Sequence, residues 1–160
     1  MRGWSIAAAL LRFRNRTKGK DKVPDSLSHI ACVDDDVDIL HVASLALETI
    51  GGLRVTTFEG PMRALDGLAL ASPDLVLLDV MMPDMDGPAF LKTMLARKEL
   101  ANLPVIFMTA RVQTSEVRRY KALGAAGVVA KPFDPMTLAD EVQAIWRSWR
   151  SAGASAVTGS

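Results

Sequence analysis

Residues 74–79 read Asp-Leu-Val-Leu-Leu-Asp, four apolar residues between two aspartates. A near-continuous apolar run of this length is typical of a strand that is covered on both faces, as strands are in a parallel sheet. The run therefore predicts a buried parallel strand, and it places Asp79 at the carboxyl end of that strand.

Apolar strands and segments with helical spacing alternate on either side of this run. The expected strands cover residues 30–33, 53–58, 74–79, 104–108 and 127–130. The expected helices cover residues 37–50, 61–72, 88–98, 112–123 and 136–150. Five strands alternating with five helices predict an α/β fold, in which right-handed crossovers place helices on both faces of a doubly wound parallel sheet.

The charge distribution divides the chain. Residues 1–28 carry seven Lys or Arg against two Asp, whereas residues 29–160 carry twelve basic against sixteen acidic residues. We expect residues 1–28 to be a basic, disordered extension, residues 29–150 to form one domain, and residues 151–160 to be a flexible tail. The alternative for the extension is a short basic amphipathic helix that lies on an anionic membrane surface.

Several classes of protein are disfavoured by composition. The acidic balance of the main domain argues against a nucleic-acid-binding surface. No apolar run approaches the roughly 20 residues that a membrane-spanning helix needs. The single cysteine, Cys32, lies inside an apolar strand, which indicates a buried thiol in a reducing cytoplasm.

Polar residues follow four of the expected strands. They are Asp34-Asp35-Asp36, Asp79, Thr109 and Lys131. In an open parallel sheet, ligands bind outside the carboxyl ends of the strands, and these residues would meet there if the strand order were 2-1-3-4-5. The pattern therefore predicts a single polar site at one edge of the sheet.

Each of these residues also has a purely structural explanation when it is taken alone. Asp36 has the position of a helix N-cap, Asp84 and Asp86 are turn-forming residues beside Gly87, and Lys131 could be a solvated charge. The agreement of four strand ends favours a functional site over four unrelated explanations.

The chemistry of the expected cluster suits phosphoryl transfer. Asp34, Asp35 and Asp79 would repel one another unless a cation or raised pKa values relieve the repulsion. A set of oxygen ligands with few carboxylates favours Mg²⁺. A carboxylate can act as the nucleophile and form an acyl phosphate, while Lys131 supplies a charge and Thr109 a hydroxyl for the phosphoryl group.

Four stretches of the sequence resemble the response-regulator receiver family. They are residues 30–36, 77–87, 105–110 and 129–133, and the resemblance extends over about residues 29–150 in the right order and spacing. It implies a flavodoxin-like sheet of strand order 2-1-3-4-5. It also implies a phosphorelay protein that takes a phosphoryl group from a sensor histidine kinase or a histidine phosphotransfer protein and catalyses only its own phosphorylation and dephosphorylation.

The resemblance also assigns roles within the cluster. Asp79 would be the phosphoacceptor, Asp35 would bind Mg²⁺ directly and Asp34 mainly through water. The backbone carbonyl of Met81 would complete the metal site. Thr109 would be the switch hydroxyl, and Lys131 would pair with the phosphoryl group. The peptide bond between Lys131 and Pro132 is expected to be cis.

One residue departs from the pattern of the family. Many receivers carry a Tyr or Phe three residues before the lysine, where this chain has Val128. Tyr120 lies nearby in the fourth helix, but it does not match that position and is expected to be a packing residue. The signalling surface is expected to be the fourth helix, the fifth strand and the last helix, which contact a protein partner.

Three alternatives remain open at the level of sequence. The chain could be a receiver that is not phosphorylated and acts only as a binding module. It could be a fragment of a DNA-binding response regulator, which needs an additional helix-turn-helix. It could be an aspartyl phosphatase of the haloacid dehalogenase type, although that class has a second Asp where this chain has Met81.

Overall fold

A computed structural model describes residues 24–158, with side chains up to residue 153. The basic extension was predicted over residues 1–28, and residues 1–23 of it, with the membrane-surface alternative, lie outside this part of the chain. Among the described residues, none of the helices combines the length and the apolar character that crossing a membrane requires.

Five strands and five helices alternate along residues 24–158. The strands are β1 (His29–Asp34), β2 (Arg54–Glu59), β3 (Leu75–Asp79), β4 (Val105–Thr109) and β5 (Gly127–Ala130). The helices are α2 (Val37–Thr49), α3 (Pro61–Ala71), α4 (Gly87–Ala96), α5 (Thr114–Ala122) and α6 (Leu138–Thr158).

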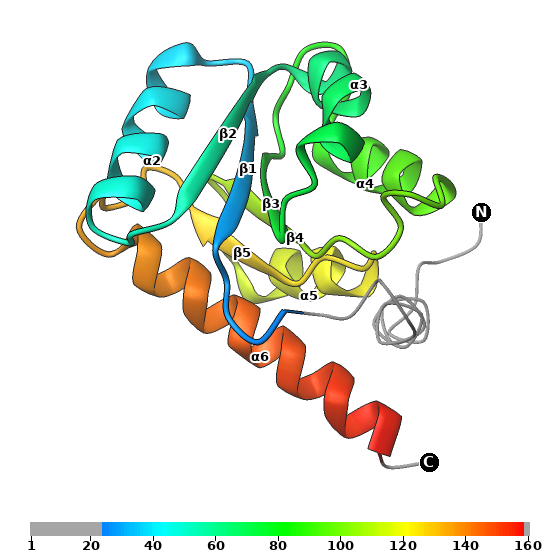
Figure 1. Ribbon diagram of the computed structural model, residues 1–160. Coiled ribbons are helices and arrows are strands. Elements are labelled where there is room, and N and C mark those ends of the chain that lie inside the picture. Colours follow the sequence, from blue (N-terminus) through cyan, green and yellow to red (C-terminus); the bar gives the residue numbers. More distant parts are fainter. Residues whose placement is uncertain (1–23, 159–160) are drawn as a thin grey trace.

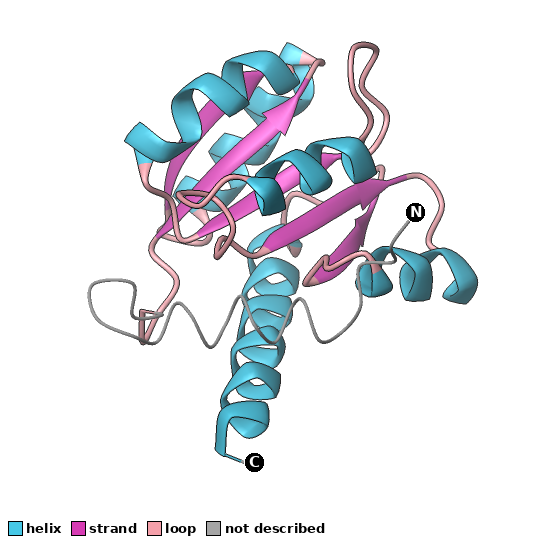
Figure 2. Cartoon of the chain, turned by 90° about the vertical axis from the view of Figure 1, so that its right-hand side faces the viewer, coloured by secondary structure: helices cyan, strands magenta, loops and turns pink. Residues whose placement is uncertain are grey.

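All five strands are parallel and lie in the order β2-β1-β3-β4-β5. Figures 1 and 2 show the twisted sheet between two layers of helices, with α2 and α6 on one face and α3, α4 and α5 on the other. The flavodoxin-like fold and its strand order, both predicted from the sequence, are confirmed.

The central strand β3 shows why the run at residues 75–78 is apolar throughout. Leu75 and Leu77 pack into the core beneath α2 and α6, whereas Val76 and Leu78 pack into the core beneath α3 and α4. All four side chains are fully buried. Each contributes on the order of 1.5–3 kcal/mol by leaving water, so both faces of the sheet hold the strand in place.

Local chemistry sets the ends of the helices next to the site. The side chain of Asp36 accepts hydrogen bonds from the backbone N–H groups of Asp38 and Ile39 at the start of α2, and that of Asp86 accepts one from Ala89 at the start of α4. The predicted N-cap role of Asp36 is confirmed. Asp86, expected to be a turn residue, is in fact an N-cap.

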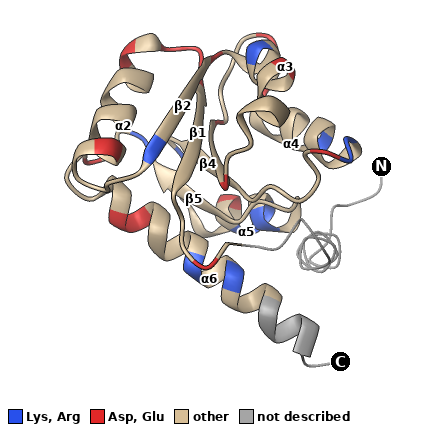
Figure 3. Ribbon diagram, viewed as in Figure 1, with Lys and Arg blue, Asp and Glu red and all other residues tan. Residues whose placement is uncertain are grey.

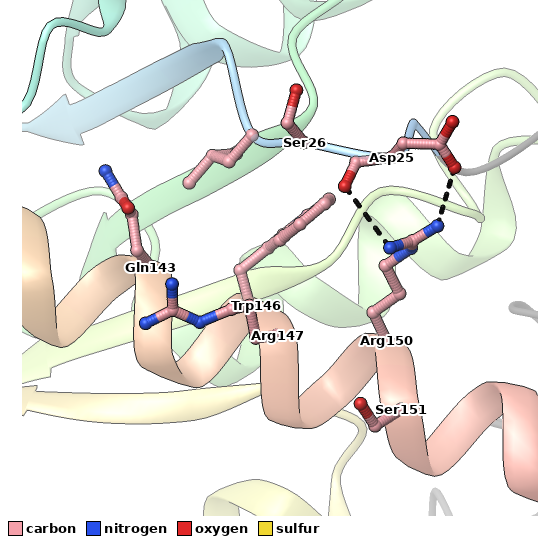
Figure 4. Close-up of a pocket in the computed structure, with 8 residues that line it drawn as sticks. Asp25, Ser26, Gln143, Trp146, Arg147, Arg150 and Ser151 are labelled. Atoms are coloured by element: carbon pink, nitrogen blue, oxygen red, sulfur yellow. Dashed lines mark hydrogen bonds and ion pairs between the residues drawn. The ribbon is translucent and has the colours of Figure 1, made fainter.

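Residues 24–28, which the sequence analysis assigned to the extension, contact the domain. One carboxylate oxygen of Asp74 accepts hydrogen bonds from the N–H groups of Ser28 and His29 and from the Ser28 hydroxyl. The guanidinium of Arg150 pairs with the carboxylate of Asp25 at 2.8 Å and donates to its carbonyl at 3.2 Å. Figure 4 shows this contact beside a cavity of about 380 Å³ between the segment and α6.

Helix α6 extends beyond the end that the sequence analysis expected at residue 150. It continues through Thr158, whereas residues 151–160 were expected to form a flexible tail. The physical reason is composition, because residues 151–158 contain several alanines and no proline. Alanine has the highest helix propensity, and the helix continues in the absence of a residue that removes a backbone donor.

Candidate functional site

The topology brings four of the predicted polar residues to one edge of the sheet. Asp34, Asp79 and Thr109 are the last residues of β1, β3 and β4, and Lys131 directly follows β5. These four strands are consecutive neighbours in the sheet. The backbone N–H of Lys131 also donates to the carbonyl of Thr109 at 2.9 Å, which holds the ends of β4 and β5 together.

Three carboxylates form an acidic cluster at this edge. Asp34, Asp35 and Asp79 each offer one oxygen, and these oxygens lie within 4.8 Å of one another. Asp34 and Asp79 are buried, and Asp35 is exposed. Figure 3 shows acidic positions where β1 passes into α2, at the same edge of the sheet. The predicted cluster is therefore half-enclosed and open to solvent through Asp35.

Lys131 bridges the two buried carboxylates. Its ammonium donates to Oδ2 of Asp34 at 2.8 Å and lies 3.1 Å from Oδ1 of Asp79. The backbone N–H of Asp36 donates to the other oxygen of Asp34, and that of Met81 donates to Oδ1 of Asp79. Both contacts to Asp79 therefore reach Oδ1, and Oδ2 receives neither of them.

The charges in the cluster perturb one another. Burial raises the pKa of Asp79, and the neighbouring charge of Asp34 raises it further, while Lys131 and the Met81 N–H oppose the rise. Burial works against the charge of Lys131, but its contacts with Asp34 and Asp79 outweigh that effect and raise its pKa. The lysine is thus held in its charged form between two carboxylates, one of which binds protons more readily than a free aspartate.

Thr109 lies at the margin of the cluster. Its side chain is buried, and its hydroxyl oxygen accepts a hydrogen bond from the N–H of Arg111 at 3.1 Å. Met81 turns its side chain outward, with 77% of the residue exposed, and directs its N–H at Asp79. The peptide bond between Lys131 and Pro132 is cis, as predicted.

Cys32 and Tyr120 are two further buried residues for which the sequence predicted a structural role. Cys32 is a buried structural thiol, as expected, and burial raises its pKa to about 12. Tyr120 packs in the core, also as expected, and its ring meets the ring of Phe107 edge-on, with centroids 5.0 Å apart. The sequence analysis did not predict that ring contact, because nothing in the spacing of residues 107 and 120 indicates that α5 packs over β4.

The sequence model of the response regulator receiver domain matches residues 30–143. The chain belongs to this family. Receiver domains are signalling modules of two-component systems. The strand-end residues Asp34, Asp79, Thr109 and Lys131 lie within the matched range.

Relatives and solved structures of the family resemble this receiver. The transcriptional regulatory protein CseB of Streptomyces coelicolor is 32% identical over 126 residues, which are 79% of this chain and 52% of CseB. The DNA-binding transcriptional regulator NtrC of Klebsiella pneumoniae is 43% identical over 102 residues, 64% of this chain and 21% of NtrC. The chemotaxis response regulator CheY4 of Vibrio cholerae matches with a TM-score of 0.68 and 29% identity, over 75% of this chain and 99% of CheY4.

The receiver spans about half or less of the length of these curated regulators, but nearly all of the solved CheY4 chain. The likeness therefore concerns the receiver domain itself.

Proposed function

We propose that this receiver accepts a phosphoryl group on Asp79 from a phosphohistidine of a partner kinase or phosphotransfer protein. The observation that carries the proposal is the arrangement at the sheet edge. There a buried carboxylate lies beside two further carboxylates and a lysine that contacts it at 3.1 Å. A nucleophile, a charge for the phosphoryl group and a set of cation ligands thus come from neighbouring strand ends.

The donor atoms of the acidic cluster fit Mg²⁺. Three carboxylate oxygens within 4.8 Å of one another are hard ligands of the kind that Mg²⁺ prefers. In this proposal Asp35 binds the ion directly, Asp34 does so mainly through water, and Asp79 and the backbone carbonyl of Met81 complete the site. When bound, the ion would neutralise charge between the carboxylate and the incoming phosphoryl oxygens.

The transfer uses the free side of the Asp79 carboxylate. Oδ2 attacks phosphorus while the bond between phosphorus and the imidazole nitrogen of the donor breaks, which forms an acyl phosphate and returns the histidine. Lys131 then pairs with the phosphoryl oxygens, and the hydroxyl of Thr109 donates a hydrogen bond to one of them. Hydrolysis of the acyl phosphate regenerates the carboxylate, so the chain catalyses only its own phosphorylation and dephosphorylation.

The donor protein has an apolar surface to contact next to the site. A hollow of about 460 Å³ lies between α2 and the loop after β5, and its lining includes Ile39, Val42, Phe133 and Lys131. Apolar side chains beside the lysine allow a partner helix to dock with its histidine near Asp79. The exchange takes place in the cytoplasm in this proposal, in keeping with the buried thiol of Cys32.

The output surface is the face formed by α5, β5 and α6, which contacts a downstream protein. Most side chains of α5 are exposed and polar, as expected from the sequence. A mostly polar face can bind and release a partner without exposing a large apolar surface to water. A second candidate is that the receiver works within a DNA-binding regulator, because NtrC and CseB are transcriptional regulators of greater length.

The test is incubation of the full chain with acetyl phosphate, with and without Mg²⁺, followed by intact mass spectrometry. We expect a gain of one phosphoryl group that requires Mg²⁺ and is absent from the Asp79→Asn variant. Asp84→Asn, a change at an exposed aspartate of the same loop, serves as the matched control and should be phosphorylated normally. No mass gain would favour the binding-module alternative, and a gain that survives Asp79→Asn would overturn the assignment of the acceptor.

A further inference from the structure

A cavity lies between residues 25–27 and α6, at the edge of the sheet opposite the acidic cluster. These residues precede the first residue of β1, whereas the acidic cluster lies at the carboxyl ends of the strands. The cavity has a volume of about 380 Å³, which is within the size range of small-molecule sites. Figure 4 shows its two walls, the segment on one side and the face of α6 with Trp146, Arg147 and Arg150 on the other.

The segment that forms the outer wall is held at both ends. Arg150 pairs with the carboxylate of Asp25 at 2.8 Å and donates to its carbonyl at 3.2 Å. At the other end, one oxygen of Asp74 accepts three hydrogen bonds from the chain at the start of β1. Between these two points Leu27 packs against the core cluster beneath α6. The wall therefore stays in place although residues 25–27 belong to no strand.

The two arginines of the cavity differ in their partners. The guanidinium of Arg150 is occupied by Asp25 and lies 5.7 Å from the centre of the Trp146 ring. Among residues 24–153, whose side chains the structure describes, no carboxylate pairs with Arg147. A guanidinium is a planar fork of donors that matches a carboxylate through two parallel hydrogen bonds. Arg147 therefore offers an anchor for one acidic group in the cavity.

Trp146 supplies the apolar part of the inner wall. The residue is 3% exposed, and its indole N–H is buried without a hydrogen-bond partner in the described part of the chain. A buried donor without an acceptor is unfavourable, and few such groups occur in folded proteins. The cavity thus combines a cation without a counter-charge, a donor without an acceptor and the apolar surface of Trp146 and Leu27.

We propose that this cavity binds a small organic acid that has one carboxylate and an apolar body such as an aromatic ring. Arg147 pairs with the carboxylate, and the apolar body lies against Trp146 and Leu27. The indole N–H donates to a carboxylate oxygen after a small shift of residues 25–27. A single negative charge is preferred because the carboxylate of Asp25 repels a doubly charged anion. The site is separate from the proposed phosphoryl transfer, which takes place at the other edge of the sheet.

The experiment titrates the full, ¹⁵N-labelled chain with benzoate and with benzamide, which is its uncharged counterpart of nearly the same shape. The indole N–H resonance of Trp146 is the readout, and it is assigned by triple-resonance spectroscopy because the chain has three tryptophans. We expect benzoate to move this resonance until it saturates. Benzamide lacks the charge and inorganic phosphate lacks the apolar body, so both should leave the resonance in place.

Variants at the cavity test the role of each charge. Arg147→Gln removes the anchor and should weaken the binding of benzoate by about tenfold or more. Arg118→Gln, at an exposed arginine of α5, is the matched control and should leave the dissociation constant unchanged. Asp25→Asn removes the competing carboxylate while Asp74 still holds the segment, so it should strengthen the binding of benzoate.

Each result bears on the cavity alone. An unmoved Trp146 resonance at saturating benzoate would overturn the proposal. Equal shifts with benzamide or with phosphate would overturn the chemistry assigned to the ligand. An unchanged dissociation constant in Arg147→Gln, with an otherwise unaltered amide spectrum, would show that the arginine is not the anchor and would overturn the proposal as well. None of these results changes the expected phosphorylation by acetyl phosphate.

Discussion

The carboxylate of Asp79 is subject to two opposing effects, the need for ionisation and the cost of burial. In the proposed transfer it must be ionised to act as a nucleophile, yet burial and the neighbouring charge of Asp34 raise its pKa. Lys131 relieves part of this conflict by contacting both carboxylates, at 2.8 and 3.1 Å. A buried carboxylate with a raised pKa costs stability at neutral pH, because folding must keep it charged.

The variant Asp79→Asn should therefore be more stable than the wild type at pH 7. The folded protein binds the Asp79 proton more tightly than the unfolded chain does. The contribution of Asp79 to the free energy of unfolding therefore declines as the pH rises from the ordinary aspartate pKa through the higher folded-state pKa. Urea unfolding should show that the variant's free energy of unfolding at pH 7 is higher by about 1 kcal/mol, and that this difference disappears in acid. Equal stability of variant and wild type at pH 7 would contradict the reasoning.

His29 is a second buried titratable residue, at the opposite end of β1. Its Nε2 lies 2.8 Å from the hydroxyl of Thr56, and its Nδ1 lies 3.2 Å from a guanidinium nitrogen of Arg54. The guanidinium can only donate, so Nδ1 is the acceptor and the ring is neutral. Burial, followed by the charge of Arg54, lowers the pKa of His29, although Asp74 partly opposes the effect.

We expect the neutral His29 to stabilise the fold at pH 7.5 and to lose that contribution in mild acid. A lowered folded-state pKa means that stability is lost as the pH falls below the unfolded value of about 6.5, by at most about 1.4 kcal/mol per pH unit. His29→Gln should flatten this part of the pH dependence, measured by urea unfolding between pH 5 and 7.5. The control His41→Gln, at an exposed position of α2, should leave the wild-type slope unchanged.

At the scale of the elements, the loop between β3 and α4 joins Asp79, the proposed acceptor, to a helix. The N–H of Gly87 donates to the carbonyl of Val80 at 2.8 Å, and a Cβ at Gly87 would lie 3.0 Å from Cα of Val80. The side chain of Asp86 accepts a hydrogen bond from the N–H of Ala89 at 2.8 Å and begins the helix. Capping and close backbone contact together hold the loop that carries Met81.

Loss of this cap should weaken the fold without abolishing the chemistry. Asp86→Ala removes the acceptor for a free N–H group of α4 and should lower the free energy of unfolding by about 1 kcal/mol. Phosphorylation by acetyl phosphate should still occur, because the acidic cluster is untouched. Asp84→Ala, in the same exposed turn, is the control. A loss of stability as large in the control as in Asp86→Ala would show that the cap is not the cause.

At the scale of the whole molecule, the acidic cluster would couple the binding of a cation to folding. The three carboxylates come from β1 and β3 and from the loop that follows β1, so a cation bound between them stabilises only the folded arrangement. Such a ligand stabilises a protein by an amount that grows with the logarithm of its concentration.

Mg²⁺ should therefore raise the melting temperature, and EDTA should reverse the rise. At a concentration 100 times its dissociation constant, the ion should add about 2.7 kcal/mol to the free energy of unfolding. Asp35→Asn removes an exposed ligand without burying a new charge and should abolish most of the effect in a thermal melt. Asp84→Asn should retain it. A rise of the same size in Asp35→Asn would place the ion elsewhere.

The sequence by itself determined the class of fold and the members of the site. Apolar runs such as residues 75–78 are covered on both faces, and a parallel sheet between two layers of helices provides such a position. The strand order was implied by the resemblance to the receiver family, and it is the order in which Asp34, Asp79, Thr109 and Lys131 would meet. The apolar runs and the motifs at the strand ends are local patterns, so they can be read from residues close together in the chain.

Only the tertiary structure decided how these residues are paired. Lys131 contacts Asp34 across 97 positions of sequence, and the ring of Tyr120 meets that of Phe107 because α5 packs over β4. The continuation of α6 to Thr158 and the pairing of Arg150 with Asp25 were likewise not predicted. Contacts of this kind depend on how helices pack on the sheet, and packing arises from the fit of many distant side chains together.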